Sequence, residues 1–313
     1  MKRVLIILIA VTVGAAAWCD WTYEGQWGKF GTGKGEFDAP GLVAVAANGN
    51  VYVADQKNHR VQYFTATGLF LGAWGSYGSG KGQFNNPSGV AVTPKGTVYV
   101  TDEGGNRVQY FTLSGSFLNE WGRAGSGKGE FNAPCAVDYN AKGDVYVAEW
   151  GNHRVQYFTS TGSYLGQWGS LGKGNRQFNN PCDVNISPNG NVYVNDHRNW
   201  RVQYFTSTGS YLDQWEISGW PTGGAIAADG GTFVADFNVN CVWVFTFGGS
   251  LVSSFGKPGS GNGEFDGPLG VALSRTGARC YVTEFNNNRV QYFNRDEPAV
   301  TPASLGRVKA LFR

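Results

Sequence analysis

Charged residues are scarce in this sequence. They make up 15% of its 313 residues, whereas aromatic residues contribute a further 15% and glycine occurs 47 times. So little charge beside so many aromatic residues is not typical of intrinsic disorder. No segment between the strand-like runs has the length and the 3.6-residue period that would predict a helix. The composition therefore excludes a helical bundle and favours many short strands joined by turns.

Long hydrophobic runs are also missing, with one exception. Residues 4–17 form an uncharged apolar run that follows two basic residues and ends in small ones. The run is too short to span a bilayer comfortably, so it predicts a cleaved secretory signal peptide over residues 1–17. An uncleaved anchor is the alternative, and Cys19 would suit a lipoprotein if bulky Trp18 did not precede it. We expect no stable membrane span after cleavage and a secreted, periplasmic or cell-surface protein.

An excess of positive charge is absent from the mature chain. The sequence holds 25 Lys and Arg against 23 Asp and Glu, and both extra cations lie at positions 2 and 3. Residues 18–313 are therefore neutral. Because nucleic-acid binding rests on neutralising phosphates, we expect no nucleic-acid partner.

One unit recurs six times along the chain. Each unit opens with a proline, and these prolines are Pro40, Pro87, Pro134, Pro181, Pro221 and Pro268. They follow one another at intervals of 47 residues, except for a single interval of 40. A period in the forties is typical of propellers and solenoids.

Each unit contains four strand-like runs. In the unit at Pro87 they are "GVAV", "TVYVTD", "RVQYFT" and "SFLNEWG", each bounded by turn residues. The last unit lacks its fourth run, and "YEGQWG" at residues 23–28 supplies a copy. The sequence therefore predicts an all-β fold over residues 18–294: a six-bladed β-propeller of four-stranded antiparallel blades, closed by the N-terminal strand. Residues 295–313 read as a Pro-containing linker and a short basic-apolar tail.

The motif "NPSGVAV…VYVTDEGGNRVQYF" resembles the NHL-repeat family. That resemblance implies a propeller serving as an RNA- or protein-binding module, as an extracellular sensor, or as a peptidylglycine amidating lyase. A zinc lyase needs several converging histidines, yet the chain has only three. Two of them, His59 and His153, occupy a position where the repeat commonly carries histidine. This shortage disfavours the lyase.

An acid and an arginine recur in five of the six units, as Asp102 and Arg107 do in the second. One such pair per blade predicts a structural role, in which the arginine satisfies an acid that organises a turn. The fifth unit departs from the pattern, because Cys241 replaces its arginine.

The positions at which the copies differ are the candidates for function. The residue after the repeated acid is a ring in units 3 to 6, and these rings are Trp150, His197, Phe237 and Phe285. With Trp200 and Asn195 nearby, they are candidate ligand-binding residues for a protein, peptide or glycan. The alternative is that some of them simply pack between blades. A non-catalytic, monomeric binding or scaffold module is the favoured function.

A second group lies on the innermost strands. Cys135 and Cys182 follow the opening proline of adjacent units, where they predict a disulfide, a soft-metal site with Asp183, or merely two small buried side chains. The last reading is favoured. Asp138 and Asn185 add polarity to the same side of the channel. The alternative function is therefore a metal-assisted lyase or hydrolase at the channel. No cofactor is predicted apart from such a divalent metal.

Overall fold

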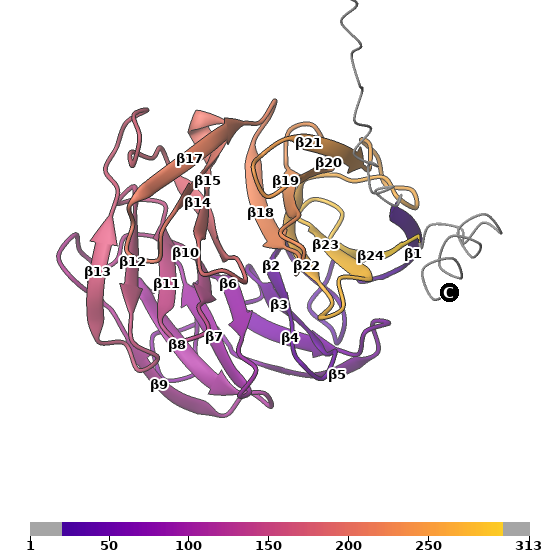
Figure 1. Ribbon diagram of the computed structural model, residues 1–313. Helices are drawn as coiled ribbons and strands as arrows, with labels where there is room; N and C mark the ends of the chain where they lie inside the picture. Colours follow the sequence, from indigo (N-terminus) through magenta and orange to yellow (C-terminus); the bar gives the residue numbers. More distant parts are fainter. Residues whose placement is uncertain (1–20, 297–313) are drawn as a thin grey trace, which may run out of the picture.

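The computed structural model describes residues 21–296, which form six four-stranded antiparallel sheets arranged around a central channel (Figure 1). The predicted signal peptide and the tail beyond residue 296 lie outside the described residues. Within residues 21–296 the only helical element is the 3₁₀ turn η1 (His197–Asn199), and no helix is long and apolar enough to cross a membrane. The predicted six-bladed propeller is confirmed.

Every blade repeats one strand order from the channel outward. The innermost strands are β2 (Pro40–Val45), β6 (Pro87–Val92), β10 (Pro134–Tyr139), β14 (Pro181–Ile186), β18 (Pro221–Ile226) and β22 (Pro268–Leu273). The second strands are β3 (Val51–Asp55), β7 (Thr97–Asp102), β11 (Val145–Glu149), β15 (Val192–Asp196), β19 (Thr232–Asp236) and β23 (Arg279–Glu284). The third strands are β4 (Arg60–Phe64), β8 (Arg107–Thr112), β12 (Arg154–Phe158), β16 (Arg201–Phe205), β20 (Cys241–Phe245) and β24 (Arg289–Arg295). The outer strands are β5 (Phe70–Trp74), β9 (Phe117–Trp121), β13 (Tyr164–Trp168), β17 (Tyr211–Glu216), β21 (Leu251–Phe255) and β1 (Trp21–Trp27).

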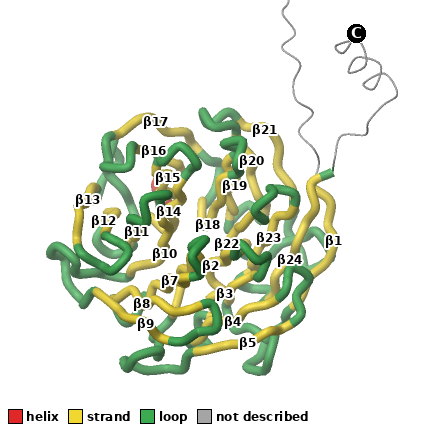
Figure 2. Tube along the Cα trace, turned by 60° about the horizontal axis from the view of Figure 1, so that its bottom comes forward, coloured by secondary structure: helices red, strands yellow, loops and turns green. Residues whose placement is uncertain are grey.

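The N-terminal strand closes the ring. β1 pairs antiparallel with β24, so that Trp21 lies opposite Arg295 and Trp27 lies opposite Val290 (Figure 2). Blade 6 thus takes three strands from the end of the chain and its outer strand from the beginning. No open sheet edge remains between the first and last blades, as the sequence predicted.

The propeller has two faces that differ in the turns they carry. One face carries the blade-to-blade connectors and the turns between second and third strands, and we call it the connector face. The opposite face carries the turns between first and second strands and between third and fourth strands, and we call it the hairpin face. The repeated acids end the second strands, as Asp55 and Glu149 do, and so lie at the connector face. The channel cavity described below opens on the hairpin face.

Tryptophan and glycine join neighbouring blades at the outer strands. Trp74 ends the outer strand of blade 1 and packs on Gly115, in the last hairpin turn of blade 2. Gly115 has a positive φ of 86°, and a Cβ placed on it would come within 2.6 Å of the indole. The glycine is therefore required both by the turn and by the close approach of the ring. The same contact joins Trp27 to Gly68 and Trp121 to Gly162.

The repeated acids and arginines form buried ion pairs. Asp102 accepts hydrogen bonds from the Asn85 amide and from Arg107 Nε, the latter at 2.9 Å. Arg107 also donates to the carbonyls of the preceding connector, including that of Gln83 at 2.7 Å. In blade 5, Cys241 stands in place of the arginine, and Trp243 Nε1, at the position of the repeated glutamine, donates to Asp236 at 3.0 Å. These groups hold the turns and connectors in place, as the one-pair-per-blade pattern predicted.

Candidate functional site

A run of aromatic rings lies on the connector face, contributed by blades 3 to 6. Trp150 and His197 have ring centroids 5.1 Å apart, and His197 lies 5.6 Å from Trp220. Phe237 and Phe285 form a second, T-shaped pair at 6.1 Å. We call these five residues the aromatic arc. Each except Trp220 directly follows the repeated acid of its blade. These side chains therefore lie at equivalent places around the propeller.

The histidine of the arc is held by a backbone carbonyl. Its Nδ1 lies 3.0 Å from the Pro221 carbonyl, and because a carbonyl oxygen only accepts, Nδ1 carries the proton. Burial lowers the pKa of His197, which favours the uncharged ring. Nε2 therefore remains as a hydrogen-bond acceptor beside two indoles.

Two cations flank the arc. The Arg198 guanidinium carbon lies 6.0 Å from the Trp150 ring centroid, and Lys57 Nζ lies 5.7 Å from that of Phe285. Such contacts hold a positive charge over an aromatic face. The surface therefore combines rings with cationic groups at both of its ends.

Trp200 departs from the residue types that the other blades carry before their third strand. The residue before the third strand has a left-handed φ in every blade, and in blade 4 it is Trp200, with φ 56°. In the other blades, the side chain at this position accepts a hydrogen bond from a backbone amide of the next blade, as His153 does from the Asn180 amide at 3.0 Å. An indole has no acceptor to offer. Trp200 nevertheless occupies this strained conformation and is 56% exposed, the kind of exception that occurs at functional sites.

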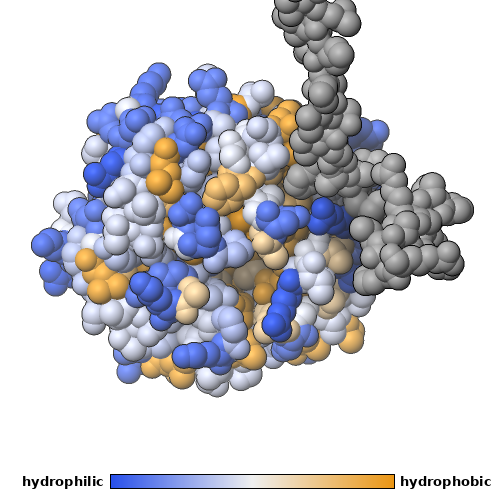
Figure 3. Space-filling view, in the orientation of Figure 1, coloured by the Kyte–Doolittle hydropathy of each residue, from blue (hydrophilic) through white to orange (hydrophobic). Residues whose placement is uncertain are grey.

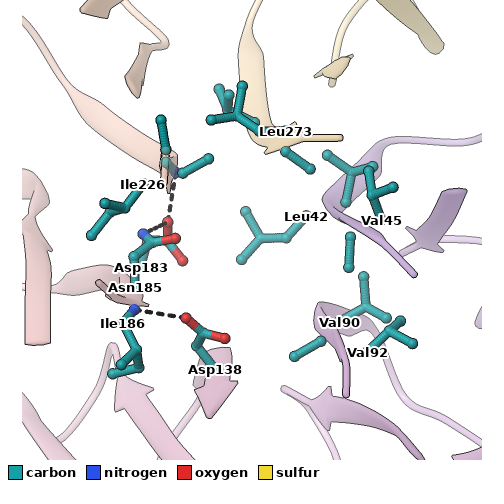
Figure 4. A pocket seen from close by; sticks show the side chains of 18 of the residues that line it. Leu42, Val45, Val90, Val92, Asp138, Asp183, Asn185, Ile186, Ile226 and Leu273 are labelled. Carbon is teal, nitrogen blue, oxygen red and sulfur yellow. Dashed lines mark hydrogen bonds between the residues drawn. The ribbon is translucent and has the colours of Figure 1, made fainter. Parts of the chain in front are cut away.

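The channel holds a cavity of about 480 Å³ near the hairpin face. Asp138, Asp183 and Asn185 lie on one wall, and Leu42 and Val90 lie opposite (Figure 4). The two carboxyl groups that line the cavity thus lie on one side of it.

Both carboxyl groups of this wall are held by the next blade. Asp183 Oδ2 accepts from the Gly224 amide at 2.6 Å, and Asp138 Oδ2 accepts from the Ile186 amide at 2.7 Å. Burial raises the pKa of each carboxyl to about 7, and these hydrogen bonds only partly offset that effect.

The NHL repeat family matches residues 37–64 and 84–111, which cover the first three strands of blades 1 and 2 apart from Thr112. The same unit recurs in all six blades of the closed ring. The chain is an NHL-repeat β-propeller.

The NHL propeller has curated relatives of which it matches only a short part. It is 44% identical over 48 residues to the B-box type zinc finger protein ncl-1 of Caenorhabditis elegans and to Protein brain tumor of Drosophila melanogaster. That stretch covers 15% of this chain and 6% and 5% of the two relatives, so the match spans about a twentieth of their length. It supports the repeat assignment. A match this short carries no information about the activity of the two relatives as whole proteins.

Solved structures similar to the NHL propeller include enzymes. A gluconolactonase from Xanthomonas campestris superposes with a TM-score of 0.64 at 14% identity, over 83% of this chain and 87% of that one. A virginiamycin B lyase from Staphylococcus aureus gives 0.62 at 13%, over 88% and 100%. At such low identity these similarities show the fold alone.

The structure places Asn195 away from the arc with which it was predicted. Asn195 is 2% exposed, and its Nδ2 donates to the Thr222 carbonyl of the next blade. Asn195 therefore links blades 4 and 5 and is not accessible to a ligand on the connector face.

The two channel cysteines of the NHL propeller also join blades. Cys135 Sγ donates to the Pro181 carbonyl at 3.1 Å, and Cys182 Sγ donates to the Pro221 carbonyl at 3.1 Å. Thr222, one blade further, makes the equivalent bond. All four cysteines of the described chain are free, and burial raises the pKa of both channel thiols well above the ordinary value.

The metal site predicted with Asp183 stays a prediction. Within residues 21–296 no three or more His, Cys, Asp or Glu side chains gather in a way that could hold a metal ion. Asp183 faces the channel cavity described above. The thiols of Cys135 and Cys182 instead donate to the backbone carbonyls of Pro181 and Pro221.

Sequence reasoning missed Trp220. It stands before the opening proline of unit 5, where the other units carry Ala39, Asn86, Ala133, Asn180 and Gly267. It is 43% exposed and completes the ring contacts of His197. The signal was present, because the connector before Pro221 is the one shortened by seven residues and the only one ending in an aromatic residue.

Proposed function

We propose that this NHL propeller is a non-catalytic binding module whose aromatic arc and Trp200 take up a protein or peptide ligand. The observation that carries the proposal is the ring contact from Trp150 through His197 to Trp220, next to a strained and exposed Trp200. Tryptophan and arginine dominate the energetics of protein interfaces, and Arg198 lies over Trp150. A glycan would use the same rings by stacking, and the ligand screen below separates the two classes.

The geometry of His197 supports binding over catalysis. In a catalytic triad a carboxylate orients the imidazole and stabilises its charged form. His197 is held by a backbone carbonyl instead, and burial lowers its pKa. The imidazole is therefore arranged as a neutral contact residue. The alternative of a metal-assisted lyase or hydrolase rests on the channel residues Asp183 and Asn185 and has less support.

We expect replacement of Trp150 and His197 by alanine to weaken ligand binding at least 30-fold, because each hot-spot ring contributes about 2 kcal/mol. A peptide-display library and a glycan array, screened with purified residues 18–296, would first supply the ligand. Calorimetry would then compare the variant with the native protein.

Phe30→Ala is the matched control, since Phe30 is an aromatic residue of the same face that is 69% exposed and lies outside the arc. It should leave affinity unchanged. Trp200→Asn should weaken binding without lowering the melting temperature, because asparagine tolerates the left-handed turn. Equal affinity of the native protein and the double variant would rule out the arc as the binding surface. Hits confined to the glycan array would transfer the proposal to a carbohydrate ligand.

We also propose that the propeller acts outside the cytoplasm, secreted, periplasmic or at the cell surface, on the strength of the apolar run at residues 4–17. We expect the exported protein to begin at Trp18, and mass spectrometry of its N-terminal peptide would measure this. Recovery of the full-length chain only from the cytosol would contradict export.

A further inference from the structure

The cavity at the hairpin face has a wall of hydrogen-bond acceptors. The side chain of Asp138 reaches this wall from β10, and those of Asp183 and Asn185 reach it from β14. Two hydrogen bonds to Asp183 fall on Oδ2, from Asn185 Nδ2 at 2.7 Å and from the Gly224 amide at 2.6 Å. Oδ1 is thereby left for a ligand, although Asp183 is only 4% exposed. In Figure 4, Asp138, Asp183 and Asn185 lie together on one side of the channel, and dashed lines join an oxygen of each carboxyl to a backbone amide of the next blade.

The facing wall is aliphatic. Its side chains come from blades 1, 2 and 6, and they are Leu42, Val45, Val90, Val92 and Leu273 (Figure 4). The volume of about 480 Å³ falls within the range of small-molecule sites. The space-filling view shows a hollow near the centre of the molecule with apolar residues at its edge (Figure 3). A ligand that fills the cavity must therefore be polar at one end and apolar along the rest.

The composition of the walls excludes two other ligand classes. Calcium takes six to eight oxygen ligands, whereas the cavity offers two carboxyl groups, and no three His, Cys, Asp or Glu within residues 21–296 gather in a way that could hold a metal ion. Sugars are held by stacking on aromatic rings, and Tyr139 is the only aromatic residue among the described residues that line the cavity. A small organic ligand with a hydrocarbon body satisfies both walls.

The sign of the polar end follows from the charges around the cavity. The titratable and charged side chains that line it are Asp138, Tyr139, Asp183 and Arg275. Arg275 is exposed at the rim, and Tyr139 is an uncharged phenol, so neither places a cation beside the two carboxyls. Burial raises the pKa of both carboxyls to about 7, and an ammonium group entering the cavity would favour their charged form.

We propose that the channel mouth on the hairpin face binds a small amphiphilic amine in its ammonium form. The ammonium donates to Asp183 Oδ1 and to Asp138, whose oxygens each accept one backbone amide, from Tyr139 and Ile186, and keep a second lone pair. The hydrocarbon body packs on Leu42, Val90 and Leu273. The site lies on the face opposite the aromatic arc and takes a different ligand, so it stands independently of the function proposed above.

Calorimetric titration of residues 18–296 with n-alkylammonium chlorides at pH 8.5 tests the site. We expect n-hexylammonium to bind saturably and each methylene removed down to n-propylammonium to weaken affinity about threefold, through lost apolar burial. Hexan-1-ol, of equal length and without charge, should bind at least tenfold more weakly. Lowering the pH to 5.5 should also weaken n-hexylammonium binding, because the carboxyls become protonated while the amine stays charged.

Asp183→Asn keeps the side-chain shape and removes the charge, so we expect an affinity loss of about tenfold or more with an unchanged circular dichroism spectrum. Asp138→Asn gives a second, independent reading of the same wall if the first variant does not fold. Trp150→Ala on the opposite face is the matched control and should bind n-hexylammonium normally. Equal binding of hexan-1-ol, equal affinity of the Asn variants, or no saturable binding at millimolar amine would each overturn the proposal.

Discussion

A chain that begins at Lys29, and therefore lacks β1, is expected to lose the cooperative unfolding transition of the intact propeller and to aggregate. Without β1 the whole of β24 becomes an exposed edge, open to pairing with other chains. Packing is lost as well. Trp21 lies 5.3 Å from Phe233 and 5.9 Å from Phe255 of blade 5, and Trp27 lies 5.5 Å from Phe64 of blade 1. Removal of one strand thus loosens three blades, which thermal unfolding and light scattering would detect.

A permuted chain provides the control for this deletion. Trp21 lies opposite Arg295, so the N-terminal end of β1 is next to the C-terminal end of β24. A short turn can therefore join residue 296 to residue 21 in a chain that runs from Lys29 to the transplanted β1. We expect this permutant to recover the melting temperature of the native protein. Full stability of the deletion alone would show that the ring does not depend on its closing strand.

Arg107→Ala is expected to lower the free energy of unfolding by about 3–5 kcal/mol, because it leaves a fully buried carboxylate without its partner. Arg107 is 8% exposed, while Asp102 is 0% exposed. The guanidinium makes five hydrogen bonds, to Asp102, Glu120 and the carbonyls of Ser79, Gly80 and Gln83. Its removal therefore leaves one buried carboxylate and several partly buried acceptors without their donor. Denaturant unfolding followed by tryptophan fluorescence would measure the loss.

The matched control is Arg123→Ala in the connector that follows. Arg123 pairs with Glu130 at 2.8 Å, but its side chain is 80% exposed. Exposed pairs contribute about 0–1 kcal/mol, so the control should barely change the unfolding midpoint. A loss for Arg107 no greater than for Arg123 would disprove the structural role assigned to the repeated acid and arginine.

The fold was predictable from the sequence because the repeat states it six times. Each opening proline and each "VYV" run marked a strand that the structure contains, and the copy of the fourth run at residues 23–28 predicted which strand closes the ring. The buried role of Arg107 followed from the same repetition. Local patterns and global architecture agree in this chain, which is why pattern reasoning succeeded.

The site was predictable only in part, since it depends on contacts between blades. Asn195 directly precedes Asp196 in β15, and successive side chains of a strand point to opposite faces, so adjacency in sequence did not place it with His197. Its partner, the Thr222 carbonyl, belongs to the next blade. The hydrogen bonds from Cys135 and Cys182 likewise reach carbonyls that lie 46 and 39 positions further along the chain. Spacing within one repeat carries no record of such contacts.

The closure of the ring by β1 also constrains the order in which the chain can fold. Blades 1 to 5 are each built from consecutive hairpins, whereas β1 and its partner β24 stand at opposite ends of the described chain. In vectorial synthesis or translocation, β1 emerges before the other strands of the propeller, and its partner β24 emerges after them. The pairing of β1 with β24 is therefore the most non-local step of folding. Until then the nascent propeller is an incomplete ring with two unpaired edges. The time needed to release the final blade, rather than the strength of any single blade, then determines how long the chain is exposed to misassociation.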